Sequence, residues 1–249
     1  MKLAGLIGFP LSHSFSKKYF NEKFLKENIE GWDYSLFPVE KISKVTDVLH
    51  ENENLIGLNV TTPYKQNILE FVDDLNIDAE EIGAVNTLKI FRDGNYVKIA
   101  GYNTDWLGFY NSLYPYLENH HEKALIFGTG GSAKAVAFAL RKLGIDYDFV
   151  SRALSDGVFT YSGLRDSILD EAKIWINCTP LGMYPESHFF PPVNYKRVTD
   201  SHLLYDLIYN PEETLFLTHG IIRGATVVNG FQMLKNQADY SFRIWSEDE

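Results

Sequence analysis

Short runs of apolar residues recur along the whole chain, and stretches with helical spacing separate most of them. The run KLAGLIGF at 2–9 opens this pattern, and KALIFG at 123–128 repeats it. Alternation of this kind is typical of α/β folds with largely parallel sheets. We therefore predict an α/β protein. Its expected strands are 2–9, 34–39, 55–61, 84–91, 97–103, 123–128, 147–152, 173–178, 203–208 and 225–230.

Local signals add a hairpin and a helix to this pattern. Asp93-Gly94-Asn95 separates the runs at 84–91 and 97–103, and a glycine between Asp and Asn at such a point indicates a tight turn. Apolar residues follow helical spacing over 106–117, behind the helix-start residues Asn-Thr-Asp at 103–105. We expect a β-hairpin in the first half of the chain, followed by an amphipathic helix.

Composition predicts a folded intracellular protein. Apolar residues make up 45% of the 249 residues, which favours a buried core over disorder. The formal net charge of −10 argues against nucleic-acid binding, since that requires clustered Lys and Arg. The chain has one cysteine, Cys178, which we expect to be a buried apolar residue in a reducing cytoplasm. We expect no secretory leader, no membrane span and no metal site.

The segment KALIFGTGGSAKAVAFALRKLG has the features of a dinucleotide-binding turn. A predicted strand ends at Phe127, the glycine-rich run Gly128-Thr129-Gly130-Gly131-Ser132 follows, and an apolar helix continues to Gly144. The first glycine allows a tight turn, the second lets the backbone approach a pyrophosphate, and the helix N-terminus offers free N–H groups. Because a strand follows within the same unit, this context predicts nucleotide binding rather than an ordinary βα turn.

The end of the next strand bears on the type of nucleotide. An NAD site places Asp or Glu there to hold the ribose 2′-hydroxyl, but this chain has Ser151-Arg152. A guanidinium pairs well with a phosphate, so NADP is favoured. Asp156, close behind, would repel that phosphate, and Arg152 as a plain surface residue is the alternative interpretation.

Polar residues gather near the ends of predicted strands in the first hundred residues. They occur at Ser14 and Ser16, in NVTTPYK at 59–65, in GAVNT at 83–87 and in GYNTD at 101–105. Each stretch has an ordinary explanation, such as a helix cap or a helix beginning at Pro63. Their recurrence instead favours a ligand site, because ligands of open α/β sheets lie outside the carboxyl ends of strands.

Eight short motifs follow one another in a fixed order along the chain. They are IGFPLSHSFS (7–16), NVTTPYK (59–65), GAVNTL (83–88), GYNTDWLG (101–108), GTGGSAKA (128–135), INCTPLGM (176–183), YDLIYNPEET (205–214) and GFQMLKNQA (230–238). In order and spacing they resemble the motifs of the shikimate dehydrogenase family, and the match runs nearly end to end.

This resemblance implies a two-domain enzyme. Residues 1–104 with 230–249 would form a substrate-binding domain, and residues 105–229 a Rossmann domain that binds NADP. The implied reaction is the reversible reduction of 3-dehydroshikimate to shikimate in aromatic amino acid biosynthesis. The implied partners are this small molecule and the nucleotide, and the protein is expected to be a cytoplasmic monomer or homodimer.

The resemblance also assigns roles to individual residues. It implies that Lys65 is the acid/base and that Asp105 supports it. The substrate carboxylate would be held by Ser14, Ser16 and Tyr209, and the ring hydroxyls by Thr61, Asn86 and Gln237. The cofactor contacts it implies are Gly128, Thr129, Gly130, Gly131, Ser132, Ser151, Arg152, Leu207, Gly230 and Met233.

Two departures from the family pattern keep alternatives open. Lys17 stands where the family has proline, and the segment 151–156 lacks the family's full basic nucleotide motif. One alternative is a quinate/shikimate dehydrogenase with relaxed substrate choice that also uses NAD. A non-catalytic sensor of shikimate-like ligands is another, and a Rossmann reductase for a different hydroxy acid is a third.

Overall fold

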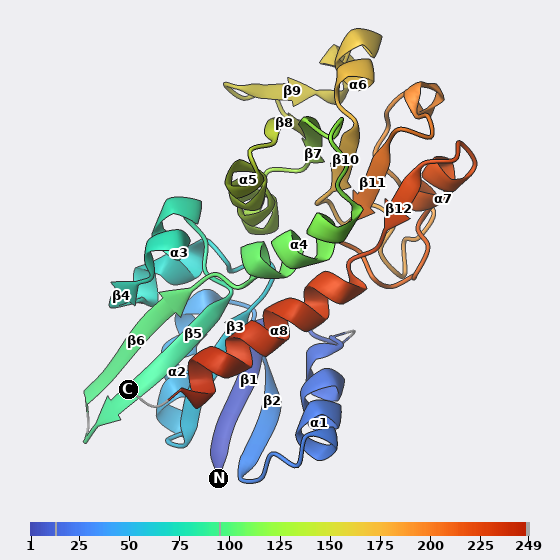
Figure 1. The fold of residues 1–249 in the computed structure, drawn as a ribbon. Helices are drawn as coiled ribbons and strands as arrows, with labels where there is room; N and C mark the ends of the chain where they lie inside the picture. The colour runs from blue at the N-terminus through green and yellow to red at the C-terminus, as the bar shows by residue number, and fades with distance from the viewer. Residues whose placement is uncertain (13, 95, 248–249) are drawn as a thin grey trace. The chain divides into compact units, whose positions relative to one another are not determined.

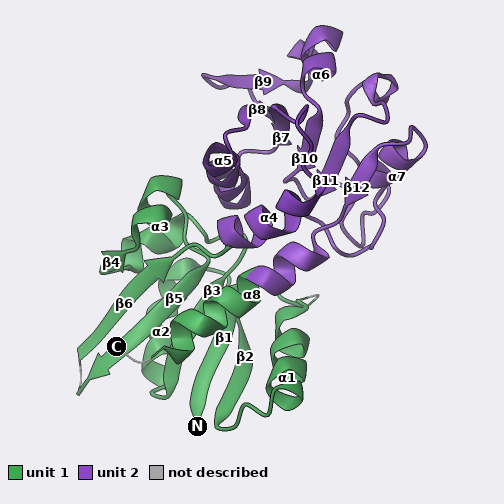
Figure 2. Ribbon diagram, viewed as in Figure 1, with its two compact units in different colours: residues 1–104, 237–249 green, residues 105–236 purple. Residues whose placement is uncertain are grey.

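The computed structural model describes residues 1–12, 14–94 and 96–247. The chain divides into two compact units, one formed by residues 1–104 and 237–249 and the other by residues 105–236 (Figure 2). The helix α8, Phe231–Ser246, contributes residues to both.

The first unit contains a mixed sheet. Its strand order is β2-β1-β3-β5-β6-β4, in which β1 pairs in parallel with β2 and β3, while β5 runs antiparallel to β3 and β6 (Figure 1). The strands are β1 (Lys2–Gly8), β2 (Trp32–Pro38), β3 (Leu55–Val60), β4 (Asp74–Leu75), β5 (Thr87–Asp93) and β6 (Tyr96–Tyr102). The helices are α1 (Ser16–Lys26), α2 (Val45–Glu51), α3 (Ile77–Ile82) and the last part of α8, with 3-10 turns at Ile42–Lys44 and Asn67–Phe71.

Alternate residues of β1 enter different cores because successive side chains of a strand point to opposite faces of its sheet. Ala4 and Leu6 pack with residues of α1 and α8, including Phe20 and Trp245. Leu3 and Ile7 pack into a second cluster with residues of α2. The sheet is thus covered by apolar side chains on both faces, as the near-continuous apolar run of β1 requires.

Gly57 in β3 is a point of close contact between α8 and the sheet. A Cβ built on Gly57 overlaps the indole of Trp245, which is 3% exposed. Trp245 Nε1 also donates a 2.9 Å hydrogen bond to the Leu88 carbonyl. Because Gly57 has no side chain, β3 leaves room for the indole of Trp245, which anchors the end of α8 to the sheet.

Gly57→Ala is expected to lower the free energy of unfolding by about 1 to 3 kcal/mol, because overpacking a tight contact forces the indole or the strand to move. Urea denaturation followed by circular dichroism measures the change. Gly130→Ala is the matched control, since a Cβ at that position meets no heavy atom of the described residues within 4 Å apart from its own residue and its chain neighbours. Equal midpoints for the two variants would contradict the prediction.

The second unit contains a parallel sheet of Rossmann order. Its strands follow the sequence β12-β11-β10-β7-β8-β9, and neighbours pair in parallel. Counted from the central strand β7, this is the doubly wound arrangement of dinucleotide-binding folds. The strands are β7 (Lys123–Phe127), β8 (Asp146–Ser151), β9 (Val158–Thr160), β10 (Ile174–Asn177), β11 (Leu203–Asp206) and β12 (Thr226–Val228). The helices are α4 (Asp105–Leu113), α5 (Gly131–Leu143), α6 (Asp166–Glu171), α7 (Leu215–Ile221) and the start of α8, with 3-10 turns at Tyr114–Tyr116, Tyr161–Gly163 and Tyr195–Arg197.

The prediction of an α/β fold with mostly parallel sheets is confirmed, and so are the expected strands, within a few residues at their ends. Strands β5 and β6 form the expected hairpin, paired at Asp93 and Tyr96. Asn95 of the predicted turn lies outside the described residues. Two short strands, β4 and β9, were not predicted, because segments of two and three residues carry almost no periodicity.

Two expected boundaries differ from the structure. The helix predicted over 106–117 begins at Asp105 but ends at Leu113, and a 3-10 turn containing Pro115 follows. Proline restricts the backbone before it and lacks an N–H, which explains the early end. The units divide between Asn236 and Gln237, inside α8, rather than at the expected boundary between 229 and 230. Within the described residues, no helix has the length and apolar character needed to cross a membrane.

Candidate active site

One edge of the first unit's sheet carries the polar motifs of the first hundred residues. The carboxyl ends of β1, β3 and β6 lie at this edge, and so does the amino end of β5, because β5 runs the opposite way. The segments next to these strand ends hold Ser14, Ser16 at the start of α1, Thr61, Lys65 and Asn86. The sheet topology thus collects residues that are far apart in the sequence.

The two serines lie where α1 begins. Ser14 Oγ accepts a 3.3 Å hydrogen bond from the backbone N–H of Ser16, so Ser14 satisfies one of the open donors at this helix start. Burial raises the pKa of Tyr34 well above its ordinary value, while a hydrogen bond between Tyr34 and Ser16 acts in the opposite direction. Both serines are half-buried and Lys17 is exposed. His13, between the serines in the motif, lies outside the described residues.

Thr61 and Lys65 belong to a turn that the neighbouring strands anchor. The Thr61 backbone N–H donates to the Ile7 carbonyl at 3.0 Å, and the Lys65 carbonyl accepts from Val85 N–H at 2.7 Å. Between them, the buried Tyr64 hydroxyl donates to the Val39 carbonyl at 2.6 Å. The chain forms a turn here rather than a helix beginning at Pro63, so the half-buried Lys65 is carried by a firmly held backbone.

Asn86 is the centre of a buried polar cluster. It is 2% exposed, and its Oδ1 accepts a 2.6 Å hydrogen bond from the backbone N–H of Thr104. Its Nδ2 donates to Thr104 Oγ1 at 2.9 Å and to Gln237 Oε1 at 3.3 Å. The structure therefore brings together two predicted substrate contacts, Asn86 and Gln237, which are 151 residues apart in the sequence.

Other polar residues beneath this cluster were not among the predicted site residues. Asn59, Thr87 and Ser241 are at most 5% exposed, and Asn59 Oδ1 accepts a 2.8 Å hydrogen bond from the Tyr34 hydroxyl. The available sequence signal was a polar residue inside an apolar strand run, as with Asn59 in LIGLNV. Such a residue needs a hydrogen-bond partner when it is buried, but the sequence does not identify that partner.

The glycine turn of the second unit has the geometry that its sequence predicted. β7 ends at Phe127, and Gly128 has a φ of 110°, a conformation open to glycine. Gly130 is the N-cap of α5 in an extended conformation, and a Cβ there meets open space among the described residues. Gly144 ends α5 in the left-handed conformation. The turn presents backbone and a helix N-terminus to any ligand above it.

The two residues expected to read the nucleotide follow β8. Ser151 is half-buried and Arg152 is exposed, as is Asp156 a few residues later. Burial raises the pKa of Tyr161 to about 12, and the positive charge of Arg152 opposes that rise. Arg152 therefore lies close enough to Tyr161 for its charge to lower the pKa of that residue, at the edge of the sheet where β8 ends.

A buried carboxylate organises the loops after β10 and β11. Asp206 is fully buried and accepts three hydrogen bonds: from Asn177 Nδ2 at 3.0 Å, from Thr214 Oγ1 at 2.6 Å and from the backbone N–H of Ile208 at 3.0 Å. Burial raises the pKa of Asp206 to about 6, and these three donors oppose the rise. Asp206 thus links the ends of two adjacent strands to the loop that carries Leu207.

The remaining predicted residues lie at defined places in the second unit. Asp105 is 5% exposed and is the first residue of α4. Tyr209 is half-buried in the loop that follows β11. Met233 is buried in the core cluster of this unit, against which Leu207 also packs. Gly230 is buried, and a Cβ there would overlap the Leu207 carbonyl oxygen. Cys178, expected to be buried, is partly exposed because it lies past the end of β10.

Comparison with known proteins places this chain in a family. A model described as the shikimate dehydrogenase substrate binding domain matches residues 6–88. The shikimate dehydrogenase (NADP(+)) of Methanosphaera stadtmanae is 34% identical over 264 residues, which cover 98% of this chain and 91% of that protein. The chain belongs to the shikimate dehydrogenase family. A second member, from Clostridium beijerinckii, is 38% identical and covers 99% of this chain and 93% of its own.

Solved structures of shikimate dehydrogenases agree with the fold. The enzyme of Thermus thermophilus, crystallised in complex with NADP(H) and shikimate, superposes with a TM-score of 0.86. It is 27% identical, and the match covers 99% of this chain and 94% of that one. The part of this chain that matches the family's substrate binding domain runs from β1 to the start of β5.

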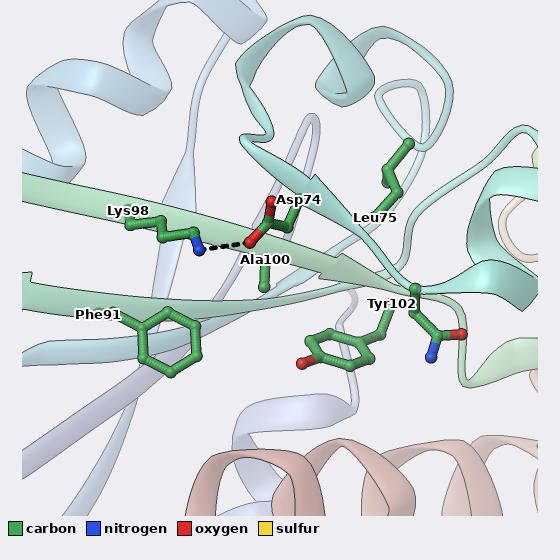
Figure 3. Close-up of a pocket in the computed structure, with 7 residues that line it drawn as sticks. Asp74, Leu75, Phe91, Lys98, Ala100 and Tyr102 are labelled. Atoms are coloured by element: carbon green, nitrogen blue, oxygen red, sulfur yellow. Dashed lines mark ion pairs between the residues drawn. The ribbon is translucent and has the colours of Figure 1, made fainter. Parts of the chain in front are cut away.

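A hollow elsewhere on the first unit is lined by other residues than those that the shikimate dehydrogenase resemblance implies for the site. It has a volume of about 360 Å³ and lies beside β4 and β6 (Figure 3). An ion pair between Lys98 and Asp74 crosses it at 2.5 Å. Among the described residues, its lining is Asp74, Leu75, Asn76, Phe91, Lys98, Ala100 and Tyr102, which includes none of the predicted site residues.

Proposed function

We propose that this protein is an NADP-dependent shikimate dehydrogenase that reversibly reduces 3-dehydroshikimate to shikimate. The observation that carries the proposal is the buried cluster of Asn86, Thr104 and Gln237 at the polar edge of the first unit. In the same chain, the second unit has the Rossmann strand order and a glycine turn of the dinucleotide type. The Methanosphaera and Clostridium relatives are both named shikimate dehydrogenase (NADP(+)).

Hydroxyl and amide groups suit the proposed substrate, a ring with one carboxylate and several hydroxyls. Ser14 and Ser16 would donate to the carboxylate, with Tyr209 as a further donor. Thr61, Asn86 and Gln237 would hold the ring hydroxyls. A site built from such groups rejects analogues that lack the hydroxyls, because its own buried polar atoms would lose their partners.

The residues of the second unit fit a dinucleotide. The open space above Gly130 leaves room for a pyrophosphate, and the α5 N-terminus adds N–H donors and the positive end of a helix dipole. Arg152 would pair with the 2′-phosphate of NADP, with Ser151 beside it. Leu207, Gly230 and Met233 would border the nicotinamide end. When bound, NADPH supplies the hydride that the amino acid side chains lack.

The protein's own contribution to the reaction is binding and proton handling. In the reducing direction, the carbonyl oxygen of 3-dehydroshikimate gains a proton as its carbon gains the hydride. We assign that proton to the Lys65 ammonium group, which would be recharged from solvent after turnover. The carboxylate of Asp105 would orient the reacting oxygen.

Gly130→Ala is expected to weaken NADP binding by about 10-fold or more, because its methyl group would occupy the space in which the backbone meets the pyrophosphate. Folding stability should change by no more than about 0.5 kcal/mol, since the site is open and its backbone extended. Isothermal titration with NADP and thermal unfolding measure the two quantities.

Gly128→Ala provides the contrast. Its φ of 110° disfavours alanine, and its Cβ would lie 3.3 Å from the Cys178 backbone. This variant should lose stability by about 1 to 3 kcal/mol. NADP affinity equal to wild type in Gly130→Ala would contradict the assignment of the turn.

An assay with two substrates and two nucleotides tests the proposal. Purified protein receives shikimate or quinate with NADP or NAD, and the absorbance of the reduced nicotinamide is followed. We expect the highest kcat/KM with shikimate and NADP. Preference for quinate with NAD would favour the relaxed dehydrogenase, and the exposed Asp156 close to Arg152 is the feature that points to it. Binding of shikimate without turnover would identify a sensor.

The proposal includes the cellular location and the oligomeric state of the enzyme. We expect it to act in the cytoplasm as a monomer or homodimer. Light scattering coupled to size-exclusion chromatography distinguishes the two states from the chain mass of 28.5 kDa.

A further inference from the structure

Ser241, on the part of α8 that belongs to the first unit, is the junction of a buried network of hydroxyls and amides. It is fully buried. Its Oγ lies 2.9 Å from Asn59 Nδ2, 2.8 Å from Thr87 Oγ1 and 3.1 Å from Thr104 Oγ1. It also lies 2.9 Å from the carbonyl oxygen of Gln237, one turn earlier in α8.

The directions of these hydrogen bonds follow from the number of protons available. The Gln237 carbonyl accepts only, so it takes the one proton of the Ser241 hydroxyl. Ser241 must then accept from its other neighbours, and the Thr87 hydroxyl at 2.8 Å becomes a donor to it. Asn59 Nδ2 donates to the same oxygen. Ser241 therefore receives protons from two different strands.

The orientation of Asn86 is fixed in the same way. Its Oδ1 must face the Thr104 backbone N–H at 2.6 Å, because a reversed amide would place two donors against each other. Its Nδ2 then donates to Thr104 Oγ1 and to Gln237 Oε1. Gln237 Oε1 accepts a hydrogen bond from Asn86, so Nε2 is the donor end of the Gln237 amide.

The Thr104 hydroxyl connects the two halves of the network. Because it accepts from Asn86 Nδ2, and because Ser241 Oγ already accepts from Asn59 and Thr87, its own proton goes toward Thr87 Oγ1 at 3.2 Å. Without the Thr87 oxygen, the Thr104 hydroxyl is left with Ser241 Oγ at 3.1 Å and with Asn86 Oδ1 at 3.3 Å, where it competes with the backbone N–H. Thr87 Oγ1 also lies 3.2 Å from Asn86 Oδ1 itself. The Thr87 hydroxyl, held by Ser241, therefore keeps Thr104 in the role that orients Asn86.

We propose that Ser241 and Thr87 are positioning residues that set the orientation of the Asn86 and Gln237 amides, and through them the choice of substrate hydroxyls. This inference rests on the proposed function. Both residues are fully buried, so neither would touch the substrate. A fixed amide pair offers one pattern of donors, whereas a mobile pair would accept analogues with a missing or displaced hydroxyl.

The test compares variants that remove or keep a hydroxyl at nearly constant shape. Thr87→Val and Ser241→Ala should each raise the KM for shikimate by about 10-fold, with the KM for NADP unchanged. Both should also reduce the kcat/KM preference for shikimate over an analogue that lacks one ring hydroxyl. Thr87→Ser keeps the hydroxyl and should return the KM to within about threefold of wild type.

Ser112→Ala is the matched control. Ser112 is a buried serine of the second unit, and its hydroxyl bonds to the Tyr205 hydroxyl at 2.6 Å and to the Phe109 carbonyl at 2.9 Å. It should lose stability without a change in the KM for shikimate. If Thr87→Val behaves like Ser112→Ala in both measurements, the inference is overturned.

A second readout separates this inference from the proposed function. The side-chain amide resonances of Asn86 and Gln237 in an NMR spectrum require no turnover. Thr87→Val should shift or broaden them, and Thr87→Ser should restore them. Inactive wild-type protein would refute the dehydrogenase, whereas active wild type with unmoved amide resonances in Thr87→Val would refute the positioning role alone.

Discussion

Replacing Lys65 with methionine is expected to lower kcat for shikimate oxidation by about 10² to 10⁴-fold, the range that a positioned acid or base contributes. Methionine keeps much of the length of the side chain but has no proton to exchange. The Lys65 backbone is held through its carbonyl by Val85 N–H at 2.7 Å, so the turn should survive the change. Steady-state kinetics give kcat and KM, and the KM for NADP should stay within about threefold.

Lys44→Met is the matched control for this experiment. Lys44 is an exposed lysine of the same unit, and it pairs with Asp47 at 2.7 Å. Its replacement removes the same positive charge from the protein outside the motif NVTTPYK (59–65) that contains Lys65. The acid/base assignment fails if Lys65→Met keeps a kcat within about threefold of Lys44→Met.

Replacing Asp206 with alanine is expected to lower the free energy of unfolding by about 3 to 5 kcal/mol. The change leaves Asn177 Nδ2, Thr214 Oγ1 and Ile208 N–H without their shared acceptor, and each stranded buried donor costs about 1 to 3 kcal/mol. Urea denaturation measures the loss. The loop after β11 should loosen as well, so the KM for NADP should rise, because the predicted cofactor contact Leu207 lies on it.

Asp206 also predicts a pH dependence of stability. Its pKa in the folded protein, about 6, lies above the ordinary value of 3.8, because burial disfavours the charged form. Between these pH values the folded state holds the proton more tightly than the unfolded state. The contribution of Asp206 to stability is therefore full below about pH 4 and is lost as the pH rises to about 6.

Asp206→Asn isolates this contribution from other titrating groups. The stability advantage of wild type over the variant should shrink by about 1 to 3 kcal/mol between pH 4 and pH 7. Denaturation curves at several pH values in this range provide the measurement. A difference that stays constant would show that Asp206 titrates near its ordinary value in the folded protein, and a difference that grows with pH would show that its pKa is lowered there.

The parts of the structure that the sequence predicted are those with local causes. Apolar strand runs, the hairpin between β5 and β6, and the glycine turn at 128–132 each depend on neighbouring residues. Gly128 and Gly144 adopt positive-φ conformations that their places at a turn and a helix end required. The motif-based resemblance added the family, which local patterns alone leave open.

The buried polar network could not be predicted in the same way. Asn59 and Ser241 are 182 residues apart in sequence, and their 2.9 Å contact exists because α8 returns to the first sheet. Nothing near Ser241 in the sequence distinguishes it from a surface serine on the polar face of a helix. Asp206 lies in a motif together with two of its donors, Ile208 N–H and Thr214 Oγ1, but its third donor, Asn177 Nδ2, comes from another strand end, and its shifted pKa follows from burial.

The return of α8 to the first unit has a consequence for the order of events during synthesis. Residues 105–236 are contiguous and leave the ribosome as a complete folding unit, whereas residues 1–104 must wait for 237–249. Until then, Gly57 lacks the indole of Trp245 and Leu88 lacks its 2.9 Å hydrogen-bond donor. The half of the protein made first is therefore completed last, and a nascent chain cut short near its end exposes the first sheet to chaperones and proteases.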